Sequence, residues 1–352
     1  MKYTFKAAIL NKLNSPLVID NITFNGNLKF GQVLVKILYS GICGSQLGEI
    51  QGVKGKDKYL PHLLGHEGIG KVIQINEKVK KVKRGDKVLL HWMPSKGINA
   101  SGPIYEWKKR RVNAGGLTTF NSYAVVSENK LSKINDIKNK IKNALLLGCT
   151  ASTAIGSVEK LSKINKNDSI AVSGCGSIGL SIIKYAKIIG IKKIVAVDIN
   201  DKKLSFAKKF GANFLLNSKK KNFLKFFKIN FPKGINHFFE CTGNTTVISN
   251  AFECLSKQFG NEILIGVPAY KKKSKFYTLD LHLGKKLIGC KGGDFSPDDD
   301  IKRYFNIVKR KNFLTDEMIT KEIKLEDIND VFSDMKKNIL LGKCLINLKE
   351  EY

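Results

Sequence analysis

Two patterns of hydrophobic and polar positions divide the chain. Up to about residue 130, short runs of β-branched and apolar residues alternate with turn residues, which is typical of strands. We predict strands at 32–38, 71–75, 87–90 and 122–127. Several short strands at this spacing predict a compact domain that resembles a β-barrel.

From about residue 143 the pattern changes. Residues 143–158 are small and apolar, as in a buried helix. An apolar strand at 169–173 is followed by a glycine turn, a helical pattern at 177–189 and a second strand at 193–198. This order predicts a doubly wound sheet of parallel strands joined by helices. Further strands are predicted at 237–240 and 262–267, before a mixed segment that runs from 291 to the end.

Residues 91–120 fit neither pattern. They hold several glycines and prolines and the basic run K-K-R-R at 108–111. We predict a long excursion from the barrel, and loops of this length are usually functional or disordered.

The composition agrees with a globular protein of two domains, with 352 residues of which 43% are hydrophobic. The seven cysteines form no C-x-x-C pair, which favours free thiols in a reducing compartment. The first residues are too polar for a signal peptide, and no apolar run reaches the roughly 18 residues of a membrane helix. We therefore expect a cytoplasmic protein without a membrane partner.

The net charge of +31 has two interpretations. A basic surface binds the phosphates of nucleic acids, but lysine can also simply fill solvated positions. The arginines are few, and the lysines are scattered as doublets and triplets through most of the chain. This scatter favours the second interpretation, so no specific nucleic-acid partner is expected.

A glycine motif follows the strand at 169–173 and opens a helix. In G-C-G-S-I-G, Gly174 makes a tight turn, Gly176 lets a pyrophosphate approach, and Gly179 lets helix pack on strand. Asp198 ends the next strand, where a carboxylate can bind both adenosine ribose hydroxyls and repel a 2′-phosphate, so NAD is favoured over NADP. An aspartate that caps a helix is the alternative. Lysines 202 and 203 could partly neutralise a 2′-phosphate.

Cys43 and His66 stand in two glycine-rich stretches, G-I-C-G-S and G-H-E-G. A thiolate and an imidazole are ligands that suit zinc, and glycines let the backbone bend around a small ion. By themselves, the two residues are weak evidence for a metal, because a small buried cysteine and a loop histidine are the more common interpretation.

An ordered series of motifs runs through the chain: G-I-C-G-S (41–45), G-H-E (65–67), G-C-T-A-S-T-A (148–154), S-G-C-G-S-I-G (173–179), V-D-I-N (197–200), F-E-C-T-G-N (239–244), I-L-I-G-V-P (263–268) and G-C-K-G-G-D-F (289–295). With them the chain resembles the zinc-dependent medium-chain alcohol dehydrogenase family along nearly its whole length. The resemblance implies a GroES-like β-barrel catalytic domain at 1–150 and 291–352, and a Rossmann dinucleotide-binding domain at 151–290.

The resemblance also implies the site residues. Cys43, His66 and Cys149 are the expected ligands of one catalytic Zn²⁺ per chain, although Cys149 alone would fit core packing. Ser45 resembles the hydroxyl residue that binds the substrate oxygen, and Glu67 resembles the acid that orients the site or reaches the metal during ligand exchange. Cofactor contacts are expected at Gly174, Gly176, Ser177, Ile178, Gly179, Asp198, Lys203, Thr242, Ile265 and Val267.

The chain departs from the family pattern in four ways. No cysteine lies between residues 44 and 148, so we expect no structural Zn²⁺. Gln46 stands where an aspartate is usual, and can offer an imidazole N–H a carbonyl oxygen but no charge. The relay histidine has no counterpart, and His62 is the nearest candidate in sequence. The arginines that grip the pyrophosphate are missing, and Lys343 is a candidate substitute without their bidentate fork.

These features predict a zinc-dependent oxidoreductase. It would transfer a hydride between an alcohol (primary, secondary, polyol or cyclitol) and NAD, giving an aldehyde or ketone. The alternatives are a zinc-free enone or quinone reductase of the same superfamily, or a non-catalytic nucleotide or nucleic-acid binder on this fold. The expected partner is a small-molecule alcohol or carbonyl substrate, and the family implies a homodimer or homotetramer.

Overall fold

The computed structural model describes residues 2–134, 141–310, 313 and 316–349, so the segment 291–352 falls partly outside the described residues. The chain divides into two compact units. Unit 1 comprises Met1–Cys149, Ser296–Val308 and Leu314–Tyr352, and unit 2 comprises Thr150–Phe295 and Lys309–Phe313.

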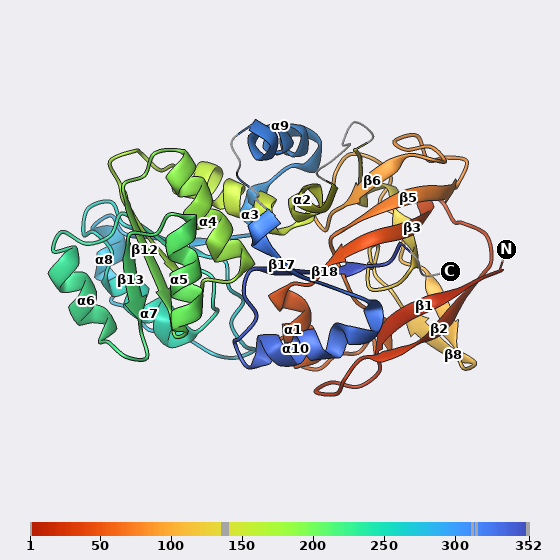
Figure 1. Ribbon diagram of the computed structural model, residues 1–352, viewed down its shortest axis with the longest axis horizontal. Helices are drawn as coiled ribbons and strands as arrows, with labels where there is room; N and C mark the ends of the chain where they lie inside the picture. Colours follow the sequence, from red (N-terminus) through yellow and green to blue (C-terminus); the bar gives the residue numbers. More distant parts are fainter. Residues whose placement is uncertain (1, 135–140, 311–312, 314–315, 350–352) are drawn as a thin grey trace. The chain divides into compact units, whose positions relative to one another are not determined.

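Unit 1 contains a closed barrel and a second sheet (Figure 1). The barrel order is β1 (Lys2–Leu10), β2 (Val18–Asn25), β7 (Ile104–Trp107), β8 (Arg110–Asn113) and β4 (His62–Leu63). The second sheet runs β10 (Leu131–Lys133), β6 (Lys87–Leu90), β5 (Gly68–Ile75), β3 (Gln32–Gly41), β18 (Lys343–Asn347) and β17 (Ile319–Ile323), with β9 (Tyr123–Ser127) also paired to β3. The predicted β-barrel domain is thus confirmed.

Strand β3 lies between two hydrophobic cores. Successive side chains of a strand point to opposite faces. Val33 and Val35 belong to one buried cluster, whereas Leu34 belongs to the cluster inside the barrel. Both faces of β3 are therefore buried, which explains its continuous apolar run.

The excursion at 91–120 holds an ordered β7–β8 hairpin, which the sequence pattern did not predict. Its turn places Lys108 and Lys109 at positive φ, 50° and 61°, which suits the twist of a two-residue hairpin loop. The side chains of Tyr105, Trp107 and Val112 are buried in the barrel cluster. The Tyr105 hydroxyl also accepts the backbone N–H of residue 125 at 2.9 Å. Apolar packing therefore orders this excursion.

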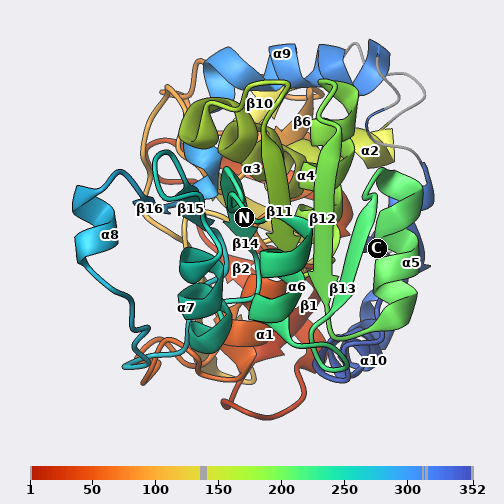
Figure 2. The ribbon, with the colours of Figure 1, turned by 90° about the vertical axis from the view of Figure 1, so that its left-hand side faces the viewer.

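Unit 2 is built on a six-stranded parallel sheet (Figure 2). Its order is β13 (Phe214–Asn217), β12 (Lys193–Asp198), β11 (Ser169–Ser173), β14 (His237–Glu240), β15 (Asn261–Leu264) and β16 (Lys286–Gly289). Every neighbouring pair is parallel. The doubly wound sheet is thus confirmed, although the strand predicted at 262–267 ends at residue 264.

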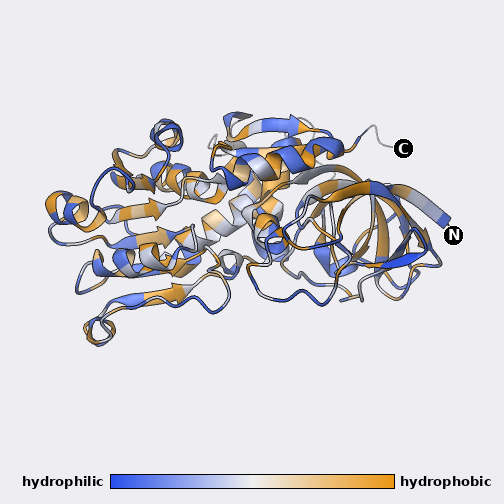
Figure 3. Cartoon of the chain, turned by 90° about the horizontal axis from the view of Figure 1, so that it is seen from below, coloured by the Kyte–Doolittle hydropathy of each residue, from blue (hydrophilic) through white to orange (hydrophobic). Residues whose placement is uncertain are grey.

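Helices cover both faces of this sheet. Val172 contacts the position of Gly179 in α4 (Ser177–Ile188). Its neighbour Ala171 packs instead in a cluster with residues of α6 (Phe223–Asn230) and α7 (Thr245–Glu253). Strands that are buried on both faces are continuous hydrophobic runs in the sequence. In Figure 3 the strands of this sheet are largely orange, the colour of hydrophobic residues.

The other described helices are α1 (Gly44–Ile50), α2 (Ile141–Leu145), α3 (Thr150–Gly156), α5 (Asp201–Phe210), α8 (Leu279–His282), α9 (Pro297–Arg310) and α10 (Ile328–Lys336). In the described part of the chain, none of the helices has the length and hydrophobicity that crossing a bilayer requires.

Replacing Tyr105 by Ala tests the packing that orders the excursion. We expect the free energy of unfolding to fall by about 3–5 kcal/mol, because a large buried aromatic side chain is lost. Both tryptophans, Trp92 and Trp107, belong to unit 1, so urea unfolding followed by tryptophan fluorescence reports this unit. Ile104→Ala on the exposed side of the same strand is the matched control, and an equal loss there would contradict the packing argument.

Candidate metal centre and nucleotide site

Three separate segments of unit 1 bring Cys43, His66 and Cys149 together. Cys43 follows β3 and is the N-cap of α1, His66 lies between β4 and β5, and Cys149 precedes α3. One ligand atom from each residue lies within 4.8 Å of the others. Across the described residues, this is the one such cluster of His, Cys, Asp and Glu.

Two glycines let the cysteine-bearing segments approach His66. A Cβ at Gly41 would lie 2.8 Å from the Glu67 carboxylate, and a Cβ at Gly148 would lie 2.9 Å from the Cβ of Glu67. Larger residues at either position would push the backbone away. Close packing on Glu67 therefore sets where the two thiols lie.

The residues fit a zinc ion. The Nε2 atom of His66 is buried and has no hydrogen-bond partner, a state that normally costs about 1–3 kcal/mol. Cys43 and Cys149 are only 8% and 7% exposed. Two thiol sulfurs and one imidazole nitrogen form a Cys₂His set, which leaves a fourth tetrahedral position open in catalytic zinc sites.

The two thiols have opposite pKa shifts. A hydrogen bond from Cys149 holds the pKa of Cys43 well below its usual value, despite burial. The same hydrogen bond and burial raise the pKa of Cys149 well above its usual value. Burial lowers the pKa of His66, but the contact with Cys43 outweighs this and the pKa is raised. The hydrogen bond thus favours a proton on Cys149, and a metal that binds both sulfurs as thiolates would displace it.

Glu67 forms a buried ion pair with Lys343. The two side chains are 0% and 1% exposed, and the Lys343 ammonium donates to a Glu67 carboxylate oxygen. Burial lowers the pKa of Lys343, but Glu67 and the two cysteines outweigh this and the pKa is raised. Lys343, the candidate for the pyrophosphate, is therefore engaged inside unit 1. The carboxylate of Glu67 is not a member of the three-residue cluster.

Two residues of α1 contact the imidazole. The Ser45 hydroxyl lies 3.4 Å from Nδ1 of His66. Gln46 is buried, and its amide contacts both Nδ1 of His66 and the backbone of Cys43. His62, the nearest relay candidate in sequence, binds Asp57 through Nε2 at 2.8 Å and a backbone carbonyl through Nδ1 at 3.0 Å.

The glycine motif in unit 2 has the geometry of a dinucleotide turn. Gly174 has φ +85°, and a Cβ at Gly179 would lie 2.1 Å from the Gly174 carbonyl oxygen. A Cβ at Gly176, by contrast, would meet nothing within 4 Å. The space beside Gly176 and the first N–H groups of α4 at Ser177 and Ile178 fit a pyrophosphate.

Asp198 at the end of β12 faces this turn. Its Oδ2 accepts the backbone N–H of Cys175 at 2.8 Å, and its Oδ1 accepts those of Ile199 and Asn200 at 2.8 and 3.0 Å. The N-cap of α5 is Asn200 rather than Asp198. Lys203 is buried beside Asp198; burial outweighs the carboxylate, and the pKa of Lys203 is lowered.

The remaining predicted cofactor residues lie in loops that meet this turn. Thr242 follows β14, and its methyl group lies 3.0 Å from the Cβ position of Gly174. Val267 follows β15, and its carbonyl oxygen lies 2.5 Å from the Cβ position of Gly243. Ile265 binds the Glu240 carbonyl at 2.8 Å. Ligands of doubly wound sheets bind at this carboxyl edge.

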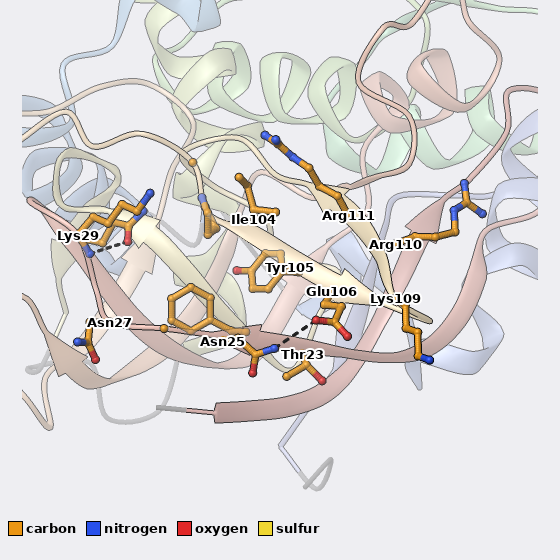
Figure 4. Close-up of a pocket in the computed structure, with 15 residues that line it drawn as sticks. Thr23, Asn25, Asn27, Lys29, Ile104, Tyr105, Glu106, Lys109, Arg110 and Arg111 are labelled. Carbon is orange, nitrogen blue, oxygen red and sulfur yellow. Dashed lines mark hydrogen bonds between the residues drawn. The ribbon is translucent and has the colours of Figure 1, made fainter.

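A separate hollow of about 490 Å³ in unit 1 lies between β2 and the β7–β8 hairpin. In Figure 4, Lys109, Arg110 and Arg111 point in different directions, while Asn25 donates to Glu106 at 3.3 Å. None of its lining residues is a predicted site residue. Its cationic groups do not converge on a point.

Removing the partner of Glu67 should destabilise unit 1. In Lys343→Met, we expect a loss of about 3–5 kcal/mol in the free energy of unfolding, because a buried carboxylate keeps no counter-charge. The double variant Lys343→Met/Glu67→Gln should recover most of this loss. Urea unfolding of the metal-free protein, followed by tryptophan fluorescence, measures both. A single variant as stable as the wild type would show that the pair contributes little.

Comparison with known proteins finds a matching family for each of the two units. Residues 29–136 match the family "Alcohol dehydrogenase GroES-like domain", and residues 177–310 match the family "Zinc-binding dehydrogenase". The structure of benzyl alcohol dehydrogenase from Acinetobacter calcoaceticus is similar, with a TM-score of 0.85 and 25% identity over 98% of this chain and 99% of the other. A zinc-binding-domain alcohol dehydrogenase from Burkholderia ambifaria has a TM-score of 0.86 at 24% identity, covering 99% of each chain, and shows the fold alone.

Curated relatives match over nearly their full length. The probable S-(hydroxymethyl)glutathione dehydrogenase 1 of Schizosaccharomyces pombe is 30% identical, covering 97% of this chain and 96% of the relative. Alcohol dehydrogenase class-3 of Drosophila melanogaster is also 30% identical, covering 95% of each. The resemblance inferred from the motifs is confirmed: the chain belongs to the zinc-dependent medium-chain alcohol dehydrogenase family.

Proposed function

We propose that this chain is a zinc-dependent oxidoreductase that transfers a hydride between an alcohol and NAD, giving an aldehyde or ketone. The observation that carries the proposal is the buried cluster of Cys43, His66 and Cys149, with its unpartnered imidazole nitrogen. A zinc-free reductase of the same superfamily needs neither thiol. A non-catalytic binder needs no such cluster, so the same observation weighs against both alternatives.

Each site residue has a proposed role. Cys43, His66 and Cys149 hold one zinc ion through two sulfurs and Nε2. When bound, zinc supplies a Lewis acid for the substrate oxygen and NAD supplies the hydride acceptor. The Ser45 hydroxyl on α1, 3.4 Å from the imidazole of His66, would take the proton of the substrate hydroxyl group while passing its own proton on to water. Glu67, held by Lys343, orients the segment that carries His66.

NAD is the proposed cofactor. The open space at Gly176 and the N-terminus of α4 support a pyrophosphate there. The Asp198 carboxylate, held by three backbone N–H groups, keeps oxygen lone pairs for the ribose hydroxyls. Its negative charge opposes a 2′-phosphate, and Lys203 balances that charge only in part.

The substrate class is narrowed by relatives rather than by the pocket. Several relatives carry the name S-(hydroxymethyl)glutathione dehydrogenase, and a structural neighbour is a benzyl alcohol dehydrogenase. We propose a primary alcohol, with secondary alcohols, polyols and cyclitols as competitors. NAD reduction with ethanol, benzyl alcohol, S-(hydroxymethyl)glutathione and a polyol compares them directly.

We also propose that the chain is cytoplasmic, forms a homodimer or homotetramer and holds no structural zinc. Its catalytic domain would comprise 1–150 and 291–352, and its dinucleotide-binding domain 151–290. Exposed apolar side chains near the edge strand β16, among them Tyr277, Leu279 and Leu283, support self-association. All seven cysteines are free, which supports a reducing compartment.

Replacing Cys43 by Ser tests the metal-dependent reaction. The wild type should hold about one zinc per chain. The variant should lose zinc and turnover, while NAD binding in unit 2 stays nearly unchanged. Elemental analysis, steady-state kinetics and fluorescence titration with NADH measure the three properties. Cys254→Ser, a partly buried thiol of unit 2, is the control. Turnover that survives the loss of Cys43 would favour a zinc-free reductase.

Replacing Asp198 by Gly tests the choice of cofactor. The ratio of kcat/KM for NAD to that for NADP should fall by about tenfold or more, since the ribose loses its acceptor and a 2′-phosphate loses its repulsion. Asp201→Ala removes an exposed carboxylate of α5 that pairs with Lys220, and should leave the ratio unchanged. A wild-type preference for NADP would refute the proposed cofactor.

A further inference from the structure

The side chain of Gln46 contacts two of the proposed zinc ligands, Cys43 and His66. It is 1% exposed and lies at the third position of α1. Its side-chain oxygen accepts the backbone N–H of Cys43 at 2.9 Å, and its side-chain nitrogen contacts Nδ1 of His66. The first contact is one half of a capping box at the start of α1. The helix cap therefore decides which end of the amide faces His66.

The end that faces His66 can only donate a hydrogen bond. An amide nitrogen carries two hydrogens and no acceptor, so Nδ1 must be the acceptor in this contact. In a neutral imidazole, the single ring hydrogen then lies on Nε2. Nε2 is the buried atom without a hydrogen-bond partner. Hydrogen bonding through Gln46 thus favours the form of His66 that cannot bind a metal through Nε2.

Metal binding through Nε2 requires the ring hydrogen to lie on Nδ1. There it would point at the amide nitrogen of Gln46, which is also a donor. Turning the amide by half a rotation presents the oxygen to Nδ1–H, but the nitrogen then faces the N–H of Cys43. The Ser45 hydroxyl, at 3.4 Å from Nδ1, lies beyond the ~2.7–3.2 Å of an ordinary N–H···O bond. The single oxygen of the Gln46 amide therefore cannot accept both the backbone N–H of Cys43 and Nδ1–H of His66, because the two donors face different ends of the amide.

We propose that Gln46 is a positioning residue that holds His66 in the form that does not bind zinc, so that loading the site requires the amide to turn and release the Cys43 backbone. The inference rests on the proposed zinc site and adds a determinant of its affinity. A carboxylate at position 46 has an acceptor at both ends, so it would cap α1 and accept Nδ1–H together.

The position of the ring hydrogen in the metal-free protein tests this directly. Nitrogen-15 chemical shifts of labelled histidine distinguish Nδ1–H from Nε2–H, and the His66→Asn variant assigns the signal among the five histidines. At a pH where the ring is neutral, we expect Nε2–H in the wild type and Nδ1–H in Gln46→Glu. A hydrogen on Nδ1 of the wild type, alone or with one on Nε2, overturns the proposal.

Zinc affinity provides a second readout, measured by competition with a chromophoric chelator. Gln46→Glu should bind zinc about 10–100-fold more tightly, the usual weight of a residue that supports a metal-ligating histidine. Gln46→Met removes both the opposing donor and the cap at similar size, and should stay within about threefold of the wild type. If Gln46 instead supported zinc binding, the Met variant would bind about 10–100-fold more weakly.

A charge control separates hydrogen bonding from electrostatics. Gly44 is exposed, and a side chain there would meet nothing within 4 Å. Gly44→Asp therefore adds a carboxylate to the same turn of α1 without touching His66, and should raise the affinity for zinc less than Gln46→Glu does. An equal rise in both variants would assign the effect to charge and overturn the proposal. Wild-type protein that binds no zinc would refute the proposed function, while the nitrogen-15 shifts would still decide the role of Gln46.

Discussion

The packing of three segments on Glu67 is the constraint on which the candidate metal centre depends. Gly41 and Gly148 lie against its side chain, and Lys343 pairs with its carboxylate. Cys43 and Cys149 follow those glycines by one or two residues, and His66 precedes Glu67 directly. The three candidate ligand atoms therefore converge because their neighbours pack around one buried carboxylate. A bulkier residue or an unpaired charge at that point would disturb all three ligands together.

Much of the fold and of the nucleotide site could be predicted from the sequence, because the signals are local. Each glycine of the motif has a fixed mechanical duty, and the position of Gly179 lies against Gly174 and against Val172 of β11, where helix meets strand. Strands of the parallel sheet are continuous apolar runs because both of their faces are buried. Asp198 illustrates the limit of such reasoning: its place in the sequence also fits a helix cap, whereas in the structure Asn200 is the N-cap of α5.

Non-local contacts could not be predicted. The partner of Glu67 is 276 residues away, and it arrives through the register of β18 on β3, in which Leu345 pairs with Gly41. The hairpin in the excursion depends on Tyr105 entering a core assembled from distant strands. The sequence shows that a glutamine replaces the usual aspartate at position 46. Which end of its amide faces His66 depends on the helix cap at Cys43, and the sequence does not show this. In each case the sequence identifies the residue, but not the residue that it contacts in the folded chain.

The charges of the centre explain why a buried lysine is tolerated beside the proposed zinc site. With both thiols ionised, Cys43, Cys149 and Glu67 carry three negative charges, and Lys343 with a divalent ion carries three positive charges, so the sum is zero. Without the ion, the hydrogen bond between the thiols holds the pKa of Cys43 low and, together with burial, raises the pKa of Cys149, so ionising both thiols is opposed although the ammonium of Lys343 lies nearby. Buried charge is stable only when it is paired. A divalent cation at the proposed site would therefore supply the positive charge that two ionised thiols need beyond that of Lys343.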